Sequence, residues 1–390
     1  MSSNAGEAGT TGPAGPAGPA PGKGHEGAPA WPSQAGPHPL GGSADVPVDR
    51  GASSSPNQRA WARFKRNRIG YGSLWIMVAL LVVSALAELI SNDRPLVARY
   101  NGEWSFPVFS NPAETAYGGD FATPTDWKDP FITQQFDRPG NWMLRTLNPH
   151  SATSTDYFQK APNPAAPSAK NWLGTDSVGQ DMVARLLYGF RVSILFGLAL
   201  TAVGTVIAVL AGAVQGYFGG RVDLTMQRLI EIWGSIPELY LLIIFASIFE
   251  PSLLLLLLLL SLFGWIGLSD YVRAEFLRNR GLEFVKAARA LGLSSRQIIW
   301  RHVLPNSMTP VITFLPFRMS GAILSLVALD FLGLGVPPSV PSLGDLVKQG
   351  KANLDSWWII FPTFAVLVMT LLLLTFIGDA LRDAFDTRKS

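Results

Sequence analysis

The chain has 390 residues, of which 48% are hydrophobic and only 15% charged, and it carries a formal net charge of +3. Its mean hydropathy is +0.24, because the charges are crowded into a few segments that leave long apolar stretches between them. This distribution is typical of a membrane protein. The sequence contains no cysteine, which excludes disulfide bonds as a source of stability.

Residues 1–57 form a tail rich in Gly, Pro and Ala. Its run GTTGPAGPAGPAPGKG keeps a Gly-Pro-Ala rhythm for only three repeats, which is too short for a collagen triple helix. We therefore predict a disordered tail. It has neither the apolar core nor the cleavage pattern of a secretory signal peptide, so the first membrane helix is expected to remain as an uncleaved anchor.

Six apolar stretches are predicted to span the membrane, because a bilayer core about 30 Å thick needs roughly 20 apolar residues of helix. They are residues 71–90, 192–214, 229–249, 253–268, 309–333 and 357–377. Pro310 and Pro316 interrupt the fifth stretch. Prolines are tolerated in a span where neighbouring groups satisfy the freed carbonyls, which favours a hinge inside a helix bundle.

Basic residues predict the orientation. Arg and Lys crowd the approach to the first span between Arg59 and Arg68, and Arg382, Arg388 and Lys389 follow the last span. Since such residues stay on the cytoplasmic side, both termini are expected to be cytoplasmic. The predicted parts are a basic flank with the first helix (58–92), a periplasmic segment (93–190), a five-helix core (191–380) and a cytoplasmic tail (381–390). The large outer segment either docks a partner or braces the assembly.

The loop at 273–307, between the fourth and fifth spans, is basic and amphipathic. From Glu283 to Leu291, the apolar or small residues Phe284, Ala287, Ala288 and Leu291 fall on one helical face. We expect Gly292 to end this helix, because a left-handed closing residue costs glycine least.

A second short helix follows this elbow. Ser294 and Gln297 form a capping-box pattern, and the helix is predicted to continue through Ile298 and Val303 and to stop around Pro305. Seven Lys or Arg residues between Arg273 and Arg301 hold the loop on the cytoplasmic side. The small Ala287 and Ala288 allow close contact with a partner's groove.

A glycine repeat near the end of the second predicted span is open to two interpretations. Gly212, Gly216 and Gly220 recur every four residues, which suits either close helix packing or a turn near GYFGGRVD. Pro237 is expected to break the third span. Glu231 and Glu238 are predicted to face protein or water, because a charge facing lipid is costly.

The sequence does not support an enzyme. His25, His38, His150 and His302 are scattered, and neither an H-E-x-x-H nor a G-x-S-x-G motif is present. PGKG in the tail resembles a phosphate loop, but Ala17 replaces its first glycine and Gly24 follows Lys23 where Ser or Thr would bind magnesium. No catalytic residue, metal site or cofactor is expected in this chain.

The loop 273–307 resembles the cytoplasmic loop of ABC importer permeases, whose pattern is E-A-A, three residues, Gly, nine residues, Ile, any residue, Leu-Pro. Lys286 and His302 depart from that pattern, whereas the Ala-Ala, Gly and Leu-Pro positions match it. The resemblance implies coupling to an ATPase subunit. The coupling residues that it and the helix pattern suggest are Glu283, Phe284, Lys286, Ala287, Ala288, Leu291, Gly292, Leu304 and Pro305.

Three longer stretches are similar to signatures of the dipeptide and oligopeptide permease family. They are WLGTDSVGQDMVARLLYGFRVSILFG from Trp172, AGAVQGYFGGRVDLTMQRLIEIWGSIPELYLL from Ala211 and LDFLGLGVPPSVPSLGDLVKQGK from Leu329. Together they cover roughly residues 170–385. The resemblance implies an all-α type I importer permease in the bacterial inner membrane, with one peripheral helix and a five-helix core.

The same resemblance implies a set of partners. These are a homologous second permease, cytoplasmic ATPase subunits that hold ATP and Mg, a periplasmic solute-binding protein, peptide cargo and membrane lipid, with no nucleic acid. Transport would proceed by alternating access, with ATPase closure pressing on the helix from Glu283 to Leu291.

RAWARFKRNRIGYGSLWIM from Arg59 and AELISNDRPLVARYNGEWSFPVF from Ala87 look like Yej-type permeases, which are associated with uptake of microcin C and oligopeptides. Two alternatives remain open. The chain could serve another solute delivered by a binding protein, such as dipeptides or nickel complexes, or it could be a stand-alone channel or scaffold.

Overall fold

The computed structural model describes residues 56–155 and 161–386, all of which fall within the unit Ser54–Ser390. The predicted disordered tail at 1–57 lies outside the described residues except for its last two positions. Residues 387–390 at the end of the predicted cytoplasmic tail also lie outside them.

Three helices open the described chain: α1 (Pro56–Arg66), α2 (Arg68–Ala85) and α3 (Ala87–Ile90). The Asn67 side chain accepts the N–H of Gly70 at 3.0 Å and caps the start of α2. The predicted span 71–90 thus covers most of α2 and α3. Helix α1 packs on α15 (Trp357–Phe385), where Phe64 is buried against Ala380 and Ala384.

The segment 93–190, which is predicted to be periplasmic and which we call the outer segment, contains strands, so the all-α prediction is wrong there. β1 (Val97–Tyr100) pairs antiparallel with both β2 (Glu103–Ser105) and β3 (Trp142–Leu144). The 3₁₀ helix η1 (Glu114–Tyr117) and α4 (Pro130–Phe136) pack beside the sheet around the buried side chains Ala98, Tyr117, Trp127, Ile132 and Phe136. Their aromatic rings supply a compact core without disulfides, as the absence of cysteine requires.

Two of the predicted spans are broken helices. After α5 (Met182–Phe218), helices α6 (Gly220–Gly234) and α7 (Glu238–Ile248) are bent by 60° relative to each other, and Pro237 lies at the break as predicted. Helices α8 (Leu253–Ser261) and α9 (Ile266–Asn279) are bent by 41°. That second break holds Gly264 but no proline, and the apolar sequence gave no reason to expect it.

The rest of the chain is also helical. The loop after α9 holds α10 (Glu283–Ala290), α11 (Ser295–Ile298), the π-helix η2 (Ile299–Val303) and α12 (Leu304–Asn306). It is followed by α13 (Thr309–Leu332), α14 (Leu343–Ala352) and α15. Across the described residues, four helices are long and apolar enough to cross a membrane, or up to six spans if each bent pair is one. Four of the six predicted spans thus fall on unbroken helices, and the other two fall on bent pairs that count as spans only if each pair is taken as one.

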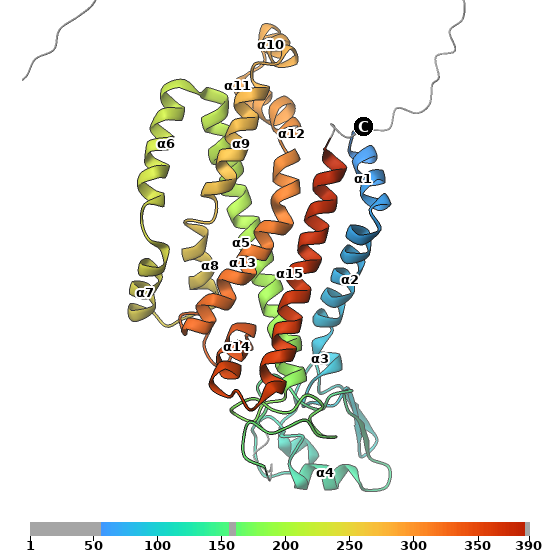
Figure 1. Ribbon diagram of the computed structural model, residues 1–390. Coiled ribbons are helices and arrows are strands. Elements are labelled where there is room, and N and C mark those ends of the chain that lie inside the picture. The colour runs from blue at the N-terminus through green and yellow to red at the C-terminus, as the bar shows by residue number, and fades with distance from the viewer. Residues whose placement is uncertain (1–55, 156–160, 387–390) are drawn as a thin grey trace, which may run out of the picture. The chain divides into compact units, whose positions relative to one another are not determined.

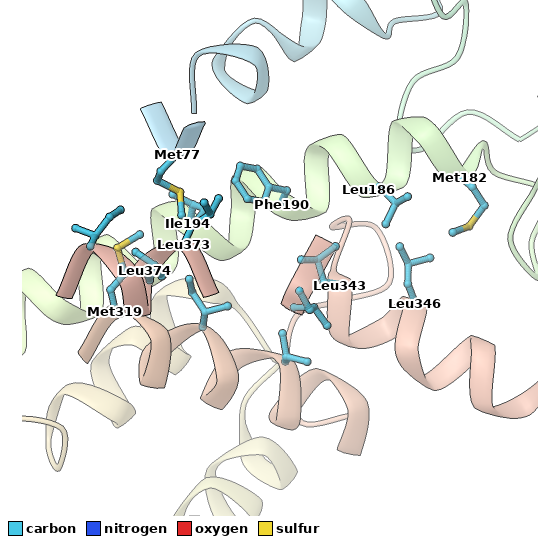
Figure 2. Packing of buried hydrophobic residues seen from close by; sticks show 14 of the residues in the cluster. Met77, Met182, Leu186, Phe190, Ile194, Met319, Leu343, Leu346, Leu373 and Leu374 are labelled. Carbon is cyan, nitrogen blue, oxygen red and sulfur yellow. The ribbon is translucent and has the colours of Figure 1, made fainter. Parts of the chain in front are cut away.

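One apolar cluster joins helices far apart in sequence. Figure 2 shows its labelled members: Met77 on α2, Met182, Leu186, Phe190 and Ile194 on α5, Met319 on α13, Leu343 and Leu346 on α14, and Leu373 and Leu374 on α15. Burial of each such side chain contributes about 1.5–3 kcal/mol relative to exposure in water. In a bilayer, where the lipid tails are also apolar, close packing between the helices supplies much of this stabilisation instead.

Helices α5 and α9 approach closely through glycine. A Cβ added at Gly212 would stand 2.6 Å from the Ser269 carbonyl oxygen, and one at Gly216 would stand 2.4 Å from the Phe276 Cβ. Gly220, with φ of +55°, instead forms the turn between α5 and α6 together with Gly219. Both interpretations of the glycine repeat therefore hold, each for different members.

A buried arginine joins α5 to α14 at the N-terminal end of α5. Arg185 is only 1% exposed. Its Nη2 lies 3.0 Å from Asp345 Oδ2 on α14, and its Nε lies 3.6 Å from Asp176 Oδ2 in the loop before α5. The outer segment joins the same region, since Asn148 Nδ2 donates to Asp181 Oδ1 at 2.8 Å.

The elements gather at two ends (Figure 1). Helices α10, α11 and α12, helix α1 and the end of α15 lie at one end, whereas α3, α4 and α14 lie at the other. At the first end, Arg63 Nη1 on α1 donates to the Asp386 carbonyl oxygen beyond α15 at 3.3 Å.

Candidate functional site

The candidate site is the helical elbow formed by α10 to α12. Helix α10 ends at a left-handed glycine, since Gly292 has a φ of +78°. The Gly292 N–H donates to the Arg289 carbonyl at 3.0 Å, and the Leu293 N–H donates to the Ala288 carbonyl at 3.2 Å. This pattern is a Schellman motif, and it confirms the predicted closing role of Gly292.

The capping box that starts the second helix is also confirmed. Ser294 Oγ accepts the Gln297 N–H at 3.3 Å, and Gln297 Oε1 accepts the Ser294 N–H at 3.0 Å. The helix then runs through η2 and α12 to Asn306. The π-helical stretch η2 was not predicted. This stretch ends directly before Leu304 and Pro305, and the proline has no N–H to donate within the helix.

The inner face of the elbow packs on the ends of α5 and α9. Val285 on α10 is fully buried, and Ala288 beside it is 5% exposed. Both belong to an apolar cluster with Tyr217 of α5, Phe276 of α9 and the second-helix residues Ile298 and Val303. The elbow is therefore fixed to the helices that precede it and does not hang free.

The outer face exposes apolar side chains. Phe284 is 40% exposed, Leu291 is 80% exposed and Trp300 on η2 is 55% exposed; Ala287 is exposed as well. We call Phe284, Ala287 and Leu291, which share one face of α10, the docking face; Trp300 belongs to a separate helix. The structure thus divides the predicted face, because Ala288 turns inward while the other three members point outward.

The remaining predicted residues lie outside this face. Lys286 Nζ pairs with Glu283 Oε1 at 2.8 Å, with both side chains largely exposed. Such an exposed pair contributes little, typically about 0–1 kcal/mol. Leu304 is partly buried against the inner cluster, and Pro305 is exposed. Sequence reasoning missed Val285, whose three-residue spacing to Ala288 marks the inner face, and Trp300, a large apolar residue among basic ones.

Polar contacts join the base of the elbow to three helices. Asn279 Nδ2 at the end of α9 donates to the buried Ser307 Oγ at 2.8 Å. Arg280 Nη1 donates to the Tyr217 carbonyl at 3.3 Å. Arg273 on α9 holds Asp223 on α6 through two hydrogen bonds, with Nη2 to Oδ2 at 2.6 Å. A bidentate pair of this kind is short and geometrically specific, so it holds α9 against α6.

The elbow lies within a part of the chain that matches a known protein family. Residues 204–390 match the family model "Binding-protein-dependent transport system inner membrane component". Residues 55–103 match "N-terminal TM domain of oligopeptide transport permease C".

Three relatives are similar over most of their length. The inner membrane ABC transporter permease protein YejE of Escherichia coli is 49% identical, covering 86% of this chain and 98% of that protein. The peptidoglycan transport system permease protein YejE of Agrobacterium fabrum is 44% identical, covering 90% and 98%. The dipeptide transport system permease protein DppC of Lactococcus lactis is 31% identical, covering 85% and 91%.

A solved structure of the MetNI methionine ABC transporter in inward-facing conformations is 17% identical over 53% of this chain and 98% of its own, with a TM-score of 0.45.

Proposed function

This chain belongs to the family of binding-protein-dependent inner-membrane transport permeases, and from that premise we propose that it imports oligopeptides or peptide-like compounds of the microcin C class. ATP would be hydrolysed, with Mg, on separate ATPase subunits. The names of the peptidoglycan transport relative from Agrobacterium fabrum and of the dipeptide transport relative from Lactococcus lactis support a peptide cargo. The observation that carries the mechanism is the docking face, an apolar surface on an elbow fixed to α5 and α9.

We infer that the docking face enters a groove of the ATPase subunit. Phe284 and Leu291 supply exposed apolar anchors, and anchors of this kind carry most of the energy of a protein interface. Closure of the ATPases would push α10, and the contacts of Phe276, Tyr217 and Asn279 would pass that displacement to α5 and α9. The helices would then rock between inward-open and outward-open states.

The arrangement of the ends supports cytoplasmic termini. The docking face must meet a cytoplasmic ATPase, and α1 and the end of α15 lie at the same end as α10 (Figure 1). The last turn of α1 carries Arg63, Lys65 and Arg66, as expected for a cytoplasmic flank. The segment 93–190 would then be periplasmic, where a binding protein delivers cargo, and 191–380 would form the core that pairs with a second permease.

Leu291→Glu tests the docking role, because Leu291 is 80% exposed and its replacement leaves the inner cluster intact. We expect ATP-dependent peptide uptake by the reconstituted assembly to fall by roughly tenfold or more, the size of a lost interface anchor. Ala290→Glu is the matched control, since Ala290 is exposed on the same helix but lies outside the docking face.

Uptake that is equal in both variants and in the original protein would refute the docking role. Uptake that proceeds without ATP or any ATPase subunit would favour the stand-alone channel instead. Quantification of the copurified ATPase separates lost assembly from lost coupling.

A further inference from the structure

An arginine without an acidic partner lies at membrane depth. Arg318 is in the middle third of α13. Its Nη2 donates to the Gly264 carbonyl oxygen at 2.7 Å, whereas its Nε is buried without a hydrogen-bond partner. Among residues 56–155 and 161–386, no carboxylate forms an ion pair with it. A cationic side chain inside a span is costly, and it usually marks a site where protein or ligand supplies an opposite charge.

Arg318 shares a cavity of about 260 Å³ with a second ionisable group, Glu238. Thr201, Gly264 and Ser325 also line this cavity, which we call the broken-span recess. Within the described parts of the chain, the Glu238 side chain forms no ion pair or hydrogen bond. The Thr201 hydroxyl is likewise buried without a partner. The recess therefore holds donors and acceptors that this chain leaves unused.

Both breaks in the spans open onto the recess. Glu238 is the first residue of α7, directly after the break at Pro237, and Gly264 lies in the break between α8 and α9. Irregular backbone at membrane depth is tolerated only where it is covered by protein or lines a water-filled cavity. The recess thus cannot face lipid.

The neighbouring helix leaves space for the guanidinium group. A Cβ added at Gly204 on α5 would stand 2.8 Å from Arg318 Nη2. Gly204 therefore permits the arginine side chain to lie along α5 and reach the carbonyl of Gly264, with its remaining N–H groups available to a ligand.

We propose that the broken-span recess binds cargo during passage, with Arg318 holding the C-terminal carboxylate of a peptide and Glu238 accepting its N–H or ammonium groups. This inference rests on the proposed import of peptides. Guanidinium and carboxylate match as a charge-assisted, bidentate pair. An acidic group in the same cavity disfavours a purely anionic ligand such as phosphate. The competing occupant is an acidic side chain of the second permease subunit.

Uptake of a peptide and of its C-terminal amide separates the two occupants. Both are measured in proteoliposomes containing the full assembly and its binding protein, for the original chain, Arg318→Gln and Arg318→Lys. Arg228→Gln is the control, because Arg228 is an exposed arginine paired with Glu231. The same binding protein delivers both peptides. Its preference between them therefore cancels when the uptake of each peptide by a variant is divided by the uptake of that peptide by the original chain.

Arg318→Gln is expected to reduce uptake of the free-acid peptide by about tenfold or more, the effect of a lost charge-assisted hydrogen bond, while the amide is unaffected. Arg318→Lys should restore part of the loss. An equal loss for both peptides, with the second permease missing from the purified assembly, would assign Arg318 to the subunit interface and overturn the proposal.

A second readout does not depend on the binding protein's preference. A photo-reactive residue at Ser325, which lines the recess, should capture labelled peptide during turnover, and Arg318→Gln should abolish the capture. Capture of the second permease alone contradicts cargo binding. If the original assembly takes up no peptide, both the proposed function and the cargo-binding role of the recess are refuted. If the Arg318→Gln assembly imports both peptides normally, only the cargo-binding role is refuted.

Discussion

At the scale of single residues, the elbow shows what a local pattern determines. Gly292 and the pair Ser294 and Gln297 make contacts within a few residues of themselves, so sequence alone predicts them. The direction of Ala288 depends on Phe276 and Tyr217, which are distant in sequence. A replacement such as Ala288→Glu therefore forces a charge into the inner cluster and tests folding of the elbow rather than docking.

His150 in the outer segment should make stability depend on pH. Its Nδ1 lies 3.3 Å from Lys128 Nζ, and its Nε2 lies 3.2 Å from the Lys170 carbonyl oxygen. The neutral ring fits both contacts, with Nε2–H donating and Nδ1 accepting. Burial first, and then the Lys128 charge, lowers the pKa of His150 below its ordinary value of 6.5.

Because the folded pKa is lowered, the unfolded chain binds more protons as pH falls through 6.5, and the folded outer segment loses stability in that direction. The loss is complete once pH is below the folded pKa. We expect the thermal midpoint, followed by tryptophan fluorescence in detergent, to fall between pH 7.5 and 5.5. His150→Gln should weaken this dependence, and an unchanged slope in that variant would contradict the assignment.

At the scale of elements, long-range contacts decide what the sequence does not reveal. The break at Pro237 follows from proline chemistry, but the break at Gly264 lies in an apolar run that is continuous with eight leucines, and its carbonyl oxygen accepts a hydrogen bond from Arg318 on α13. The strands of the outer segment could not be predicted for a similar reason. β1 and β3 are separated by α4 in the sequence and pair only in the folded segment.

The α5–α9 contact offers a test at this scale. Gly216→Ala introduces a methyl group that would stand 2.6 Å from the backbone oxygen of Arg273 as well as close to Phe276. Neither backbone can move without separating the helices, so we expect destabilisation of about 1–3 kcal/mol, typical of overpacking. Denaturant or thermal unfolding of the purified chain measures it.

Gly72→Ala is the control for this substitution. Gly72 lies on α2, and an added Cβ there meets no atom within 4 Å. Its replacement should be neutral or slightly stabilising, because alanine is the better helix former. A loss of stability as large as that of Gly216→Ala would show that the glycine spacing in α5 has no special role.

At the scale of the whole molecule, the hydropathy pattern located the apolar helices. The bends in these helices and their packing against one another depend on tertiary contacts. The exposed apolar face of α10 was partly predictable, since Phe284, Ala287 and Leu291 fall on one face of a regular helix. The broken-span recess was not, because Glu238, Gly264 and Arg318 come from three separate stretches of sequence.

Topology is testable directly. A reporter fused after Ser390 should be active in its cytoplasmic form, and one inserted within 120–141 should be active in its periplasmic form, because α1 and α10 lie at one end and the outer segment at the other. Expression of each fusion is checked by immunoblotting. The reverse pattern of activity would invert the proposed orientation and separate the docking face from any cytoplasmic ATPase.

The ion pair between Arg185 and Asp345 can form only late in the synthesis of the chain. Its members are 160 residues apart, which a ribosome translating about 5–20 residues per second covers in roughly 10–30 s. During that interval α5 has entered the nascent protein without α14, and Asp176 is the only one of the two acidic groups beside Arg185 that has been made. We therefore expect the N-terminal end of α5 to reach its final state late, only after α14 has been synthesised.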